Sequence, residues 1–410
     1  MARPLEDVTI LDLTWVLAGP YASMVLCDLG ADVIKVERPP WGDISRTSGP
    51  YQNGWSGYFF SVNRGKRSAV IDLSKDEGRE LFMQMAEKVD VVMENFRPGT
   101  MEKLRLDYRA LSERNPRLIM ASTSGFGQTG PYKNRPALDI VVQGMGGVMS
   151  ITGEPGRGPI RPGVSYGDVT AGLYTAIGIL AALHERQRSG KGQHIDISML
   201  DCQVSVLENA IMRYGVTGKA PEPIGTRHPT ATPFQAFPTA DGYIVVALGF
   251  GSENPWNIFC GLLGVPELMD DPRFDTGPKR TQHHAELEPL LSAALRKQPS
   301  AHWLAEFEAV GIPSGPVNTI PQMLADPQVQ YREMVREVTH PTAGTLRIAN
   351  TPLRMSRSES GIKGPPPDFG GDTAAVLHQL LGMNADEVAA MAANGIVSTE
   401  GGPDVEQLLK

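Results

Sequence analysis

The sequence predicts an α/β protein with a large domain built on a doubly wound, Rossmann-like parallel sheet and a smaller α+β domain. Through residues 1–200, short β-prone runs alternate with amphipathic helical stretches, the order typical of parallel βαβ units. A chain of 410 residues also exceeds the usual span of one hydrophobic core. Between residues 215 and 233 the composition shifts to Gly, Pro and Thr, as in a linker.

Two successive βαβ units are predicted near the N-terminus. In the first, Pro20 takes the first helical position and Gly30 ends the helix, because proline suits helix starts and glycine suits helix ends. In the second, the run from Ser74 to Glu77 predicts a capping box. The predicted strands span residues 8–14, 32–37, 68–73 and 91–96, and the predicted helices span residues 21–29 and 74–89.

A long apolar helix is predicted to begin at Asp168 and to end near Arg188, followed by a turn and a strand at 194–199. Its most apolar stretch, residues 169–183, is too short to cross a bilayer comfortably and is interpreted as a buried core helix. The predicted organisation is a large domain at 1–200, a linker at 201–225, a small α+β domain at 226–320 and a C-terminal segment at 321–410.

Composition limits the classes of function. The net charge is −8 with both signs interspersed, which argues against a nucleic-acid or anionic-membrane surface. The three cysteines are far apart, so neither a disulfide framework nor a zinc site is indicated. No two histidines share metal-ligand spacing except the adjacent His283 and His284, which fit a surface position. The N-terminus carries no secretory signal, and a cytoplasmic location is expected.

The loop from Ser124 to Pro131, SGFGQTGP, contains the G-x-G-x-x-G pattern of dinucleotide-binding turns and follows a predicted strand at 117–122. The helix that should hold a pyrophosphate is not predicted, because Pro131 follows the third glycine and no 3.6-residue apolar period comes after it. The acidic residue expected about twenty positions later is also missing. A nicotinamide cofactor is therefore not favoured.

Asp168 stands at the predicted start of the long helix. One role is that of an N-cap whose carboxylate accepts free backbone N–H groups. A second role is chemical: the helix dipole would keep the carboxylate ionised, and nearby N–H groups would hold an oxyanion. Attack of a carboxylate on a thioester gives a mixed anhydride, which keeps the group-transfer potential that a serine ester would lose. The two roles do not exclude each other.

Four stretches of the sequence resemble the class III CoA-transferases, the family of formyl-CoA transferase and carnitine CoA-transferase. They are LDLTWVLAGPYASMVLCDLGADVIKVE from Leu11, VDVVMENFRPGT from Val89, SGFGQTGPY from Ser124, and GDVTAGLYTAIGILAALHERQRSGKGQHIDISMLD from Gly167. The resemblance continues through HPTATPFQAFPTADG, IPSGPVN and DPQVQYREM, and so covers nearly the whole chain.

The resemblance implies that Asp168 is the family's nucleophile. It would attack an acyl-CoA to form an aspartyl anhydride, pass through an aspartyl-CoA thioester and a second anhydride, and hand CoA to an acceptor acid. The substrates would be CoA thioesters and small carboxylic acids, with no metal and no tightly bound cofactor. The resemblance also implies a homodimer of interlocked, ring-like chains, in which residues 321–410 return to complete the large, CoA-binding domain.

Several residues that follow predicted strands, at the usual ligand edge of a parallel sheet, match CoA-binding positions of the family. A forked guanidinium among them would suit the CoA phosphates. Each of these side chains also has a simpler possible role in the core or on the solvated surface. The matched positions are Trp15, Val16, Leu17, Ala18, Arg38, Leu73, Lys75, Asn95, Phe96, Arg97, Lys103 and Met199.

Five further residues are candidates for contact with the acids. Gln128 lies in the loop that the family places near the active-site entrance, and Asp139 is either a helix cap or a neighbour of the substrate. We expect an arginine, Arg46 or Arg227, to bind a distal carboxylate by charge pairing. His228 opens the second domain and would face the acyl group.

Three alternatives stay open: an α-methylacyl-CoA racemase, a hydrolase that lets water open the anhydride, and a non-catalytic CoA-binding protein. A racemase needs a His/Asp acid–base pair, and Leu138 stands where racemases have the histidine. Formyl-CoA transferases carry a run of glycines of which residues 248–251 are only a weak echo, so oxalate is less favoured as acceptor. Carnitine stays open, and succinyl-CoA with a short dicarboxylate is the preferred pair.

Overall fold

The structure is a computed structural model that describes residues 2–248 and 255–403. It divides into two compact units, and each is described by itself below. The first unit comprises the chain up to residue 148, residues 161–215 and the chain from residue 328 onward, and the second comprises residues 149–160 and 216–327. The stretch predicted as a linker, 201–225, holds most of helices α9 (Met199–Ser205) and α10 (Glu208–Thr217).

A seven-stranded sheet forms the centre of the first unit. Its strand order is β14-β5-β2-β1-β6-β7-β8, and every pairing is parallel except that of β14 with β5. The six parallel strands therefore follow the Rossmann order, which confirms the predicted α/β sheet. The strands are β1 (Thr9–Asp12), β2 (Asp32–Glu37), β5 (Arg67–Ile71), β6 (Val91–Glu94), β7 (Ile119–Ser124), β8 (His194–Ser198) and β14 (Val397–Ser398).

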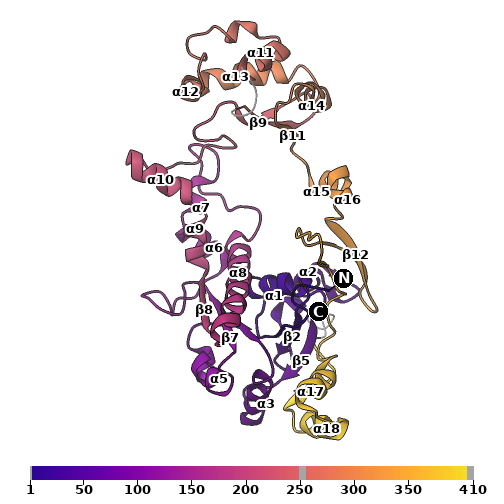
Figure 1. Ribbon diagram of the computed structural model, residues 1–410. Coiled ribbons are helices and arrows are strands. Elements are labelled where there is room, and N and C mark those ends of the chain that lie inside the picture. Colours follow the sequence, from indigo (N-terminus) through magenta and orange to yellow (C-terminus); the bar gives the residue numbers. More distant parts are fainter. Residues whose placement is uncertain (1, 249–254, 404–410) are drawn as a thin grey trace. The chain divides into compact units, whose positions relative to one another are not determined.

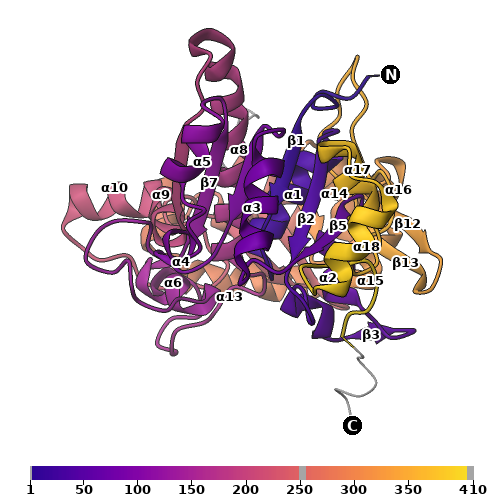
Figure 2. The same cartoon turned by 90° about the horizontal axis from the view of Figure 1, so that it is seen from below.

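Helices cover both faces of this sheet. One face carries α1 (Ala18–Asp28) and α8 (Tyr166–Ser189), which pack on each other, and the opposite face carries α3 (Asp76–Ala86), α5 (Tyr108–Arg114) and α17 (Thr373–Leu381). Successive strand residues point to opposite faces, so Ile10 lies in the core under α1 and α8 while Leu11 lies in the core under α3 and α17. Figure 1 shows α1 beside α8, and Figure 2 shows α3 in front of the sheet with α17 beside β5.

The first helix differs from its prediction at its start. It begins at Ala18, so Pro20 is its third residue and not its first. Gly30 follows the end of the helix as predicted, with φ +116°, a conformation that side-chain-bearing residues rarely adopt. The entry to α1 therefore depends on the loop after β1 and not on a proline start.

The capping box predicted for α3 is wrong. The helix begins at Asp76 and ends at Ala86, and Lys75 before it makes no side-chain cap. Ser74 Oγ instead donates to Asp72 Oδ1 at 2.6 Å. Such local side-chain hydrogen bonds compete with helix capping.

The long helix α8 begins before the predicted residue. Its first residue is Tyr166 and its N-cap is Ser165, so Asp168 is the third helical residue and not the cap. At 24 residues α8 is long and apolar enough to cross a membrane by length and composition, although 44% of its apolar window is buried inside the protein. The prediction of a buried core helix holds for one side only, because Leu173 is 42% exposed and Ile177 is 57% exposed.

The C-terminal segment adds structure to the first unit. Its hairpin of β12 (Val335–His340) and β13 (Gly344–Ala349) is antiparallel. Further on, α18 (Ala385–Ala393) leads into β14, the antiparallel partner of β5. Lys75 Nζ donates to the carbonyls of Asn394 at 2.7 Å and Gly395 at 2.9 Å, and so ties this segment to the start of α3.

The second unit is a small α+β structure. Its antiparallel sheet has the order β11-β10-β9, and helices α11, α13 and α14 supply core residues such as Phe259, Leu291 and Phe307. These elements are β9 (Phe234–Pro238), β10 (Tyr243–Ala247), β11 (Ser314–Pro316), α11 (Pro255–Leu263), α13 (His284–Leu295) and α14 (Ser300–Ala309).

Short elements complete the described chain. They are η1 (Ile44–Thr47), β3 (Tyr51–Gln52), β4 (Trp55–Ser56), α2 (Gly57–Val62), α4 (Thr100–Lys103), α6 (Asp139–Met145), α7 (Val148–Ile151), η2 (Pro266–Leu268), α12 (Gly277–Gln282), α15 (Ile320–Ala325) and α16 (Pro327–Tyr331).

Candidate active site

The loops after β1 and β6 meet where the strand order of the main sheet reverses. In doubly wound sheets, ligands bind beyond the carboxyl ends of the strands at this point. Asn95, which follows β6, accepts a hydrogen bond from the Trp15 amide and donates one to the Trp15 carbonyl, both at 2.9 Å. Phe96 meets the Trp15 ring edge-on, with centroids 6.2 Å apart. Three of the predicted CoA-binding residues are thus joined to one another at the switch point.

Asp168 lies in the first turn of α8, on the helix that packs against α1. Residues four positions apart lie on the same face of a helix, and Gly172 is four residues beyond Asp168. A Cβ at Gly172 would be only 2.8 Å from the carbonyl oxygen of Ala18. The glycine permits this close approach, which places the predicted nucleophile and the predicted CoA-binding start of α1 on facing surfaces.

Asp139, the first residue of α6, caps the helix that carries Asp168. Its Oδ1 accepts hydrogen bonds from the amides of Gly167 at 2.8 Å and Asp168 at 3.4 Å. Residue 167 must be small, because a Cβ there would lie 2.8 Å from Val142 Cγ2. The capping role predicted for Asp168 therefore belongs to Asp139, which does not cap its own helix, where Leu138 is the N-cap.

Two side chains hold the other oxygen of Asp139. Its Oδ2 accepts from Gln143 Nε2 at 2.7 Å and from Arg161 Nη2 at 3.0 Å. Arg161 Nη2 also donates to Ser165 Oγ at 3.1 Å. Asp139 is buried at 9% exposure, so its carboxylate is fixed by these bonds beside the head of α8.

The surroundings of Asp168 disfavour a negative charge. Burial, the largest cause, and the neighbouring carboxylate of Asp139 raise its pKa from 3.8 to about 7, while Arg161 acts in the opposite direction. The backbone amide of Asp168 donates a hydrogen bond to the Asp139 side chain. Within residues 2–248 and 255–403, the Asp168 carboxylate itself makes no hydrogen bond. From the sequence we expected the helix dipole to keep Asp168 ionised; its pKa is instead raised, because burial and Asp139 disfavour the charge. Such perturbation is typical of active-site groups.

Tyr58, on α2, is a neighbour of Asp168 that the sequence analysis missed. Burial raises the pKa of Tyr58 to about 12, and the charges of Asp168, Asp43 and Asp139 add to the effect. Its ring packs with Leu17 at the entry to α1. Neither a motif nor a spacing links residue 58 to residue 168, so only the fold reveals this electrostatic interaction.

Arg161 is the second residue missed. It lies in a Gly- and Pro-rich stretch without periodicity, where the sequence gives no sign of a partner. Its side chain is 37% exposed while one edge is paired with Asp139, so part of the guanidinium remains accessible beside the Asp168 site.

Three of the predicted CoA-binding cations are exposed and follow strands of the main sheet. They are Arg38 after β2, and Arg97 and Lys103 after β6. In the described part of the chain, none of the three forms an ion pair with a carboxylate. Their charges are therefore available to the phosphates of a ligand. Lys75 differs, because its ammonium already bonds the two carbonyls of the C-terminal segment.

Leu73 and Met199 contribute to packing. Leu73 lies against the core under α3, and Met199 is 7% exposed in a cluster with Val142 and Ala171 beside α8. Their contacts with CoA remain predictions.

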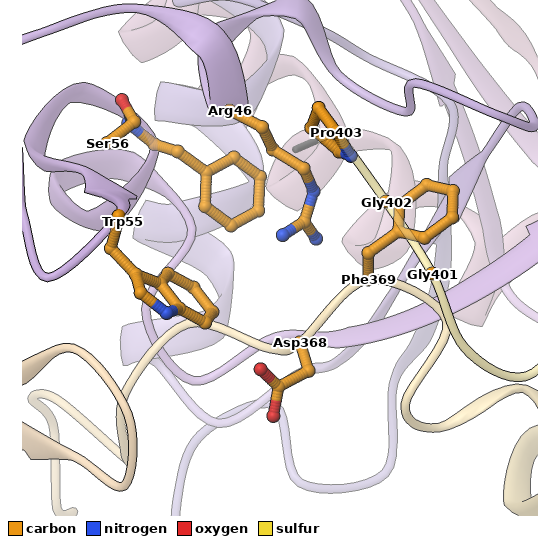
Figure 3. Close-up of a pocket in the computed structure, with 10 residues that line it drawn as sticks. Arg46, Trp55, Ser56, Asp368, Phe369, Gly401, Gly402 and Pro403 are labelled. Atoms are coloured by element: carbon orange, nitrogen blue, oxygen red, sulfur yellow. The ribbon is translucent and has the colours of Figure 1, made fainter. Parts of the chain in front are cut away.

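Arg46 is buried and already paired. Its Nε and Nη2 donate to the two carboxylate oxygens of Glu37 at 2.8 Å and 2.6 Å, and its guanidinium lies 3.8 Å from the centroid of the Phe59 ring. Arg46 lines a cavity of about 220 Å³. Figure 3 shows Asp368 and Phe369 among the residues that line the same cavity. Because Glu37 neutralises this arginine, we do not assign Arg46 to a distal carboxylate.

Gln128 lines a different cavity of about 210 Å³ in the first unit, together with Arg97, Glu94 and His194. The backbone amide of Gln128 donates to both carboxylate oxygens of Asp196 at 3.0 Å. The contact predicted between Gln128 and the substrate remains a prediction.

Arg227 and His228 lie in the second unit. Arg227 Nε donates to the Ile224 carbonyl at 3.2 Å, and the exposed His228 ring lies 4.9 Å from that of Phe234. Their substrate roles remain predictions. Of the weak glycine echo at 248–251, residues 249–251 lie outside the described chain. Among residues 2–248 and 255–403, no three His, Cys, Asp or Glu side chains are grouped so that they could hold a metal ion.

Known proteins resemble this chain over nearly its whole length. Residues 5–373 match CoA-transferase family III. A succinate–glutarate CoA-transferase from Agrobacterium fabrum is 40% identical over 384 residues, which cover 92% of this chain and 96% of the relative. An acetyl-CoA:oxalate CoA-transferase from Acetobacter aceti is 43% identical over 355 residues, which cover 86% of this chain and 89% of the relative.

A solved structure agrees with the fold. The crystal structure of a CAIB/BAIF family protein from Brucella suis matches with a TM-score of 0.84 and 40% identity. The match covers 93% of this chain and 100% of that chain.

Proposed function

The chain belongs to CoA-transferase family III, and from this we propose that it moves CoA from succinyl-CoA to a short dicarboxylic acid with Asp168 as the covalent nucleophile. The observation that carries the proposal is the state of Asp168. Its carboxylate lies at the head of α8 without a hydrogen-bond donor among the described residues, beside the start of α1, and its pKa is raised to about 7. A carboxylate that is poorly stabilised in the ground state is a better nucleophile than a paired one.

The proposed cycle balances without a cofactor. An Asp168 oxygen forms a bond to the thioester carbon and the C–S bond breaks, which gives an aspartyl anhydride and CoA thiolate. The thiolate attacks the aspartyl carbonyl, releases succinate and leaves an aspartyl-CoA thioester. The acceptor carboxylate then displaces the thiolate to form a second anhydride, which the thiolate opens at the acceptor carbonyl. Acceptor-CoA leaves, and Asp168 keeps one oxygen atom from the acceptor.

The substrate choice draws on the names of relatives. The Agrobacterium fabrum protein is named for succinate and glutarate, which supports the dicarboxylate preference inferred from the sequence. The Acetobacter aceti protein is named for oxalate, so oxalate belongs in any screen of acceptors although the sequence disfavours it. A distal carboxylate would pair with an arginine; Arg46 is already used by Glu37, and the role of Arg227 remains a prediction.

A racemase is less well supported than a transferase. Leu138 is 73% exposed and provides no acid or base in the place of the racemase histidine. Asp139 beside it accepts from two amides and two side chains, and a carboxylate bound in this way is poorly placed to shuttle an α-proton.

An exposed apolar surface supports the predicted homodimer. On α8, Leu173 and Ile177 are exposed, and on α10, Ile211, Met212 and Tyr214 are 50%, 65% and 56% exposed. Surfaces of this kind mark protein–protein interfaces in soluble proteins, and a second copy of the chain is the commonest partner.

The test follows one oxygen atom. The protein is incubated with succinyl-CoA and glutarate whose carboxylates carry a heavy-oxygen label, then digested, and the peptides are weighed by mass spectrometry. The label should accumulate in the peptide that contains Asp168, and hydroxylamine added with succinyl-CoA should trap a hydroxamate on the same residue. D168N should lose transfer, while D201N, which changes an exposed aspartate on α9, should keep it. Label in any other peptide, or transfer by D168N, would refute the proposal.

A further inference from the structure

The loop between β1 and α1 is held by side chains of other elements. The Thr14 amide donates to Asp12 Oδ1 at 2.9 Å, and the Thr14 carbonyl accepts from Lys35 Nζ at 2.7 Å. Asn95 bonds both backbone polar groups of Trp15. Since backbone groups normally pair in helices or sheets, this degree of side-chain support is a feature that needs a reason.

The next residue, Val16, has an unusual backbone. Its φ is +66°, in the left-handed region that is unfavourable for side-chain-bearing residues and most of all for β-branched ones. Its side chain is 37% exposed, so close packing of that side chain does not explain the conformation. Its amide donates to Asp43 Oδ1 at 3.1 Å. Strained residues persist where their surroundings over-determine them, and they cluster at functional sites.

A buried ion pair joins the two ends of this loop. Lys35 Nζ lies 2.8 Å from Asp43 Oδ2, and both side chains are 1% exposed. Lys35 therefore bonds Thr14 while Asp43 bonds Val16, and each fixes the other. The side chain of Asp43 is itself held in place, because its Oδ1 accepts a hydrogen bond from the backbone amide of Ser45 at 2.9 Å. A buried pair contributes little net stability against an apolar replacement, so geometry is the better explanation for it.

The loop leads directly to the proposed nucleophile. Two residues after Val16, the Ala18 carbonyl meets α8 at Gly172, on the face that carries Asp168. Burial and the charges of both Asp168 and Asp43 raise the pKa of Tyr58, so the ion pair and the nucleophile both act electrostatically on this one side chain.

We propose that Lys35 and Asp43 are positioning residues that hold Val16 in the left-handed conformation and thereby set the start of α1 opposite Asp168. This inference rests on the proposed function, because it assigns the loop to the acyl-CoA side of that site. Neither residue touches the reacting atoms; both act through the backbone of the loop.

The test uses the freedom of glycine, which adopts positive φ without strain. The variants are D43N, V16G and V16G/D43N, and the readout is kcat/KM for succinyl-CoA with glutarate as acceptor. We call the pair of Lys35 and Asp43 the clamp. D43N should reduce kcat/KM about tenfold in the wild-type background. Adding D43N to V16G should reduce it about threefold or less, because glycine adopts this backbone conformation without the clamp. An equal reduction in both backgrounds would overturn the inference.

A matched control separates positioning from general stability. Asp28 and Arg64 form another buried ion pair in the first unit, 2.6 Å apart with 2% and 4% exposure, away from this loop. D28N should lower the unfolding midpoint in urea but keep kcat/KM within about twofold. If D28N lowers kcat/KM as much as D43N, the clamp is refuted. Where D43N does not fold, K35M keeps the side-chain length and takes its place in the same cycle.

Urea unfolding keeps this inference distinguishable from the proposed function. If the wild-type chain transfers no CoA from any acyl-CoA, the proposed function fails, but the clamp still predicts coupling between residues 16 and 43. The D43N substitution should shift the urea midpoint less in the V16G background than in the wild-type background. Equal shifts in the two backgrounds would overturn the clamp whatever the activity.

Discussion

The substitution D139N should move the pH dependence of the reaction. Asparagine keeps the shape of Asp139 and its Oδ1 can still accept from the Gly167 amide, so the head of α8 stays capped. It removes the negative charge that raises the pKa of Asp168. Because Asp168 must be ionised to attack, the rate should rise with pH as this group loses its proton, and D139N should shift that rise to lower pH.

The size of the shift follows from the spacing of the two groups. Asp139 Oδ1 lies 3.4 Å from the Asp168 amide. A carboxylate separation of roughly 5–7 Å at an effective dielectric constant of about 20 gives a repulsion of ~2–3 kcal/mol, or ~2 pKa units at 1.36 kcal/mol each. Burial is the largest cause of the rise from 3.8 to about 7, so the share of Asp139 must be the smaller part of that rise, and we expect a shift of about one unit. Burial, the larger cause, is unchanged and keeps the pKa above 3.8.

The assay is kcat/KM for succinyl-CoA between about pH 5 and pH 9. The wild-type curve should have an acidic limb near the raised pKa of Asp168, about 7, and D139N should move that limb down by about one unit. The control is D201N, which removes a charge from the exposed start of α9 and should leave the limb in place. An acidic limb that stays put in D139N, or that moves to higher pH, would refute the electrostatic account of this site.

Three other outcomes follow from the same structure. The pKa of Asp168 is raised on folding, so its ionisation costs stability as pH rises from about 4 to 7. At about pH 8 the free energy of unfolding of D168N should therefore exceed that of wild type by ~2 kcal/mol, seen as a higher unfolding temperature, and at about pH 4 there should be no gain. R97E should raise KM for succinyl-CoA by about tenfold and weaken the rise of KM with salt, because Arg97 is exposed and unpaired within the described chain and salt would no longer screen an attraction to phosphate; an unchanged KM counts against its contact with phosphate. I177D places a charge on the exposed side of α8 and should turn the proposed homodimer into a monomer on size-exclusion chromatography; an unchanged elution volume would exclude this face from the proposed interface.

Much of the fold could be predicted because it depends on local patterns. The alternation of strand and helix gives parallel connections of known handedness, and these bring the residues after β1, β2 and β6 to one edge of the sheet. The family resemblance assigned Asn95 and Trp15, 80 positions apart, to one CoA-binding site, and their places after strands agree with it. The resemblance also assigned Asp168 as the nucleophile, whereas its place before an apolar helix was consistent with a cap as well as with a chemical role.

The surroundings of Asp168 could not be predicted in the same way. The bonds from Asp139 to Gly167 and to Arg161 join residues across turns and irregular chain, where no periodicity specifies a partner. Arg46 shows the opposite error: an arginine near a predicted site suggests a ligand, yet Glu37 on β2 lies close enough to pair with it. The sequence shows which residues are charged, but only tertiary packing determines which of these charges neutralise each other.

The surroundings that raise the pKa of Asp168 also favour its acylation in the proposed mechanism. An ionised Asp168 is partly buried beside Asp139 and lacks a hydrogen-bond donor to its carboxylate among the described residues. Attack on the thioester replaces this charge with a neutral anhydride, and the negative charge leaves on sulfur. The transition state therefore escapes a penalty that the ground state bears, at 1.36 kcal/mol per pKa unit. Since D139N removes part of that penalty, it should work at lower pH yet accumulate a smaller fraction of acyl-enzyme at about pH 8 than wild type, which rapid-quench mass spectrometry can measure. Equal or greater accumulation in D139N would show that Asp139 does not drive the covalent step.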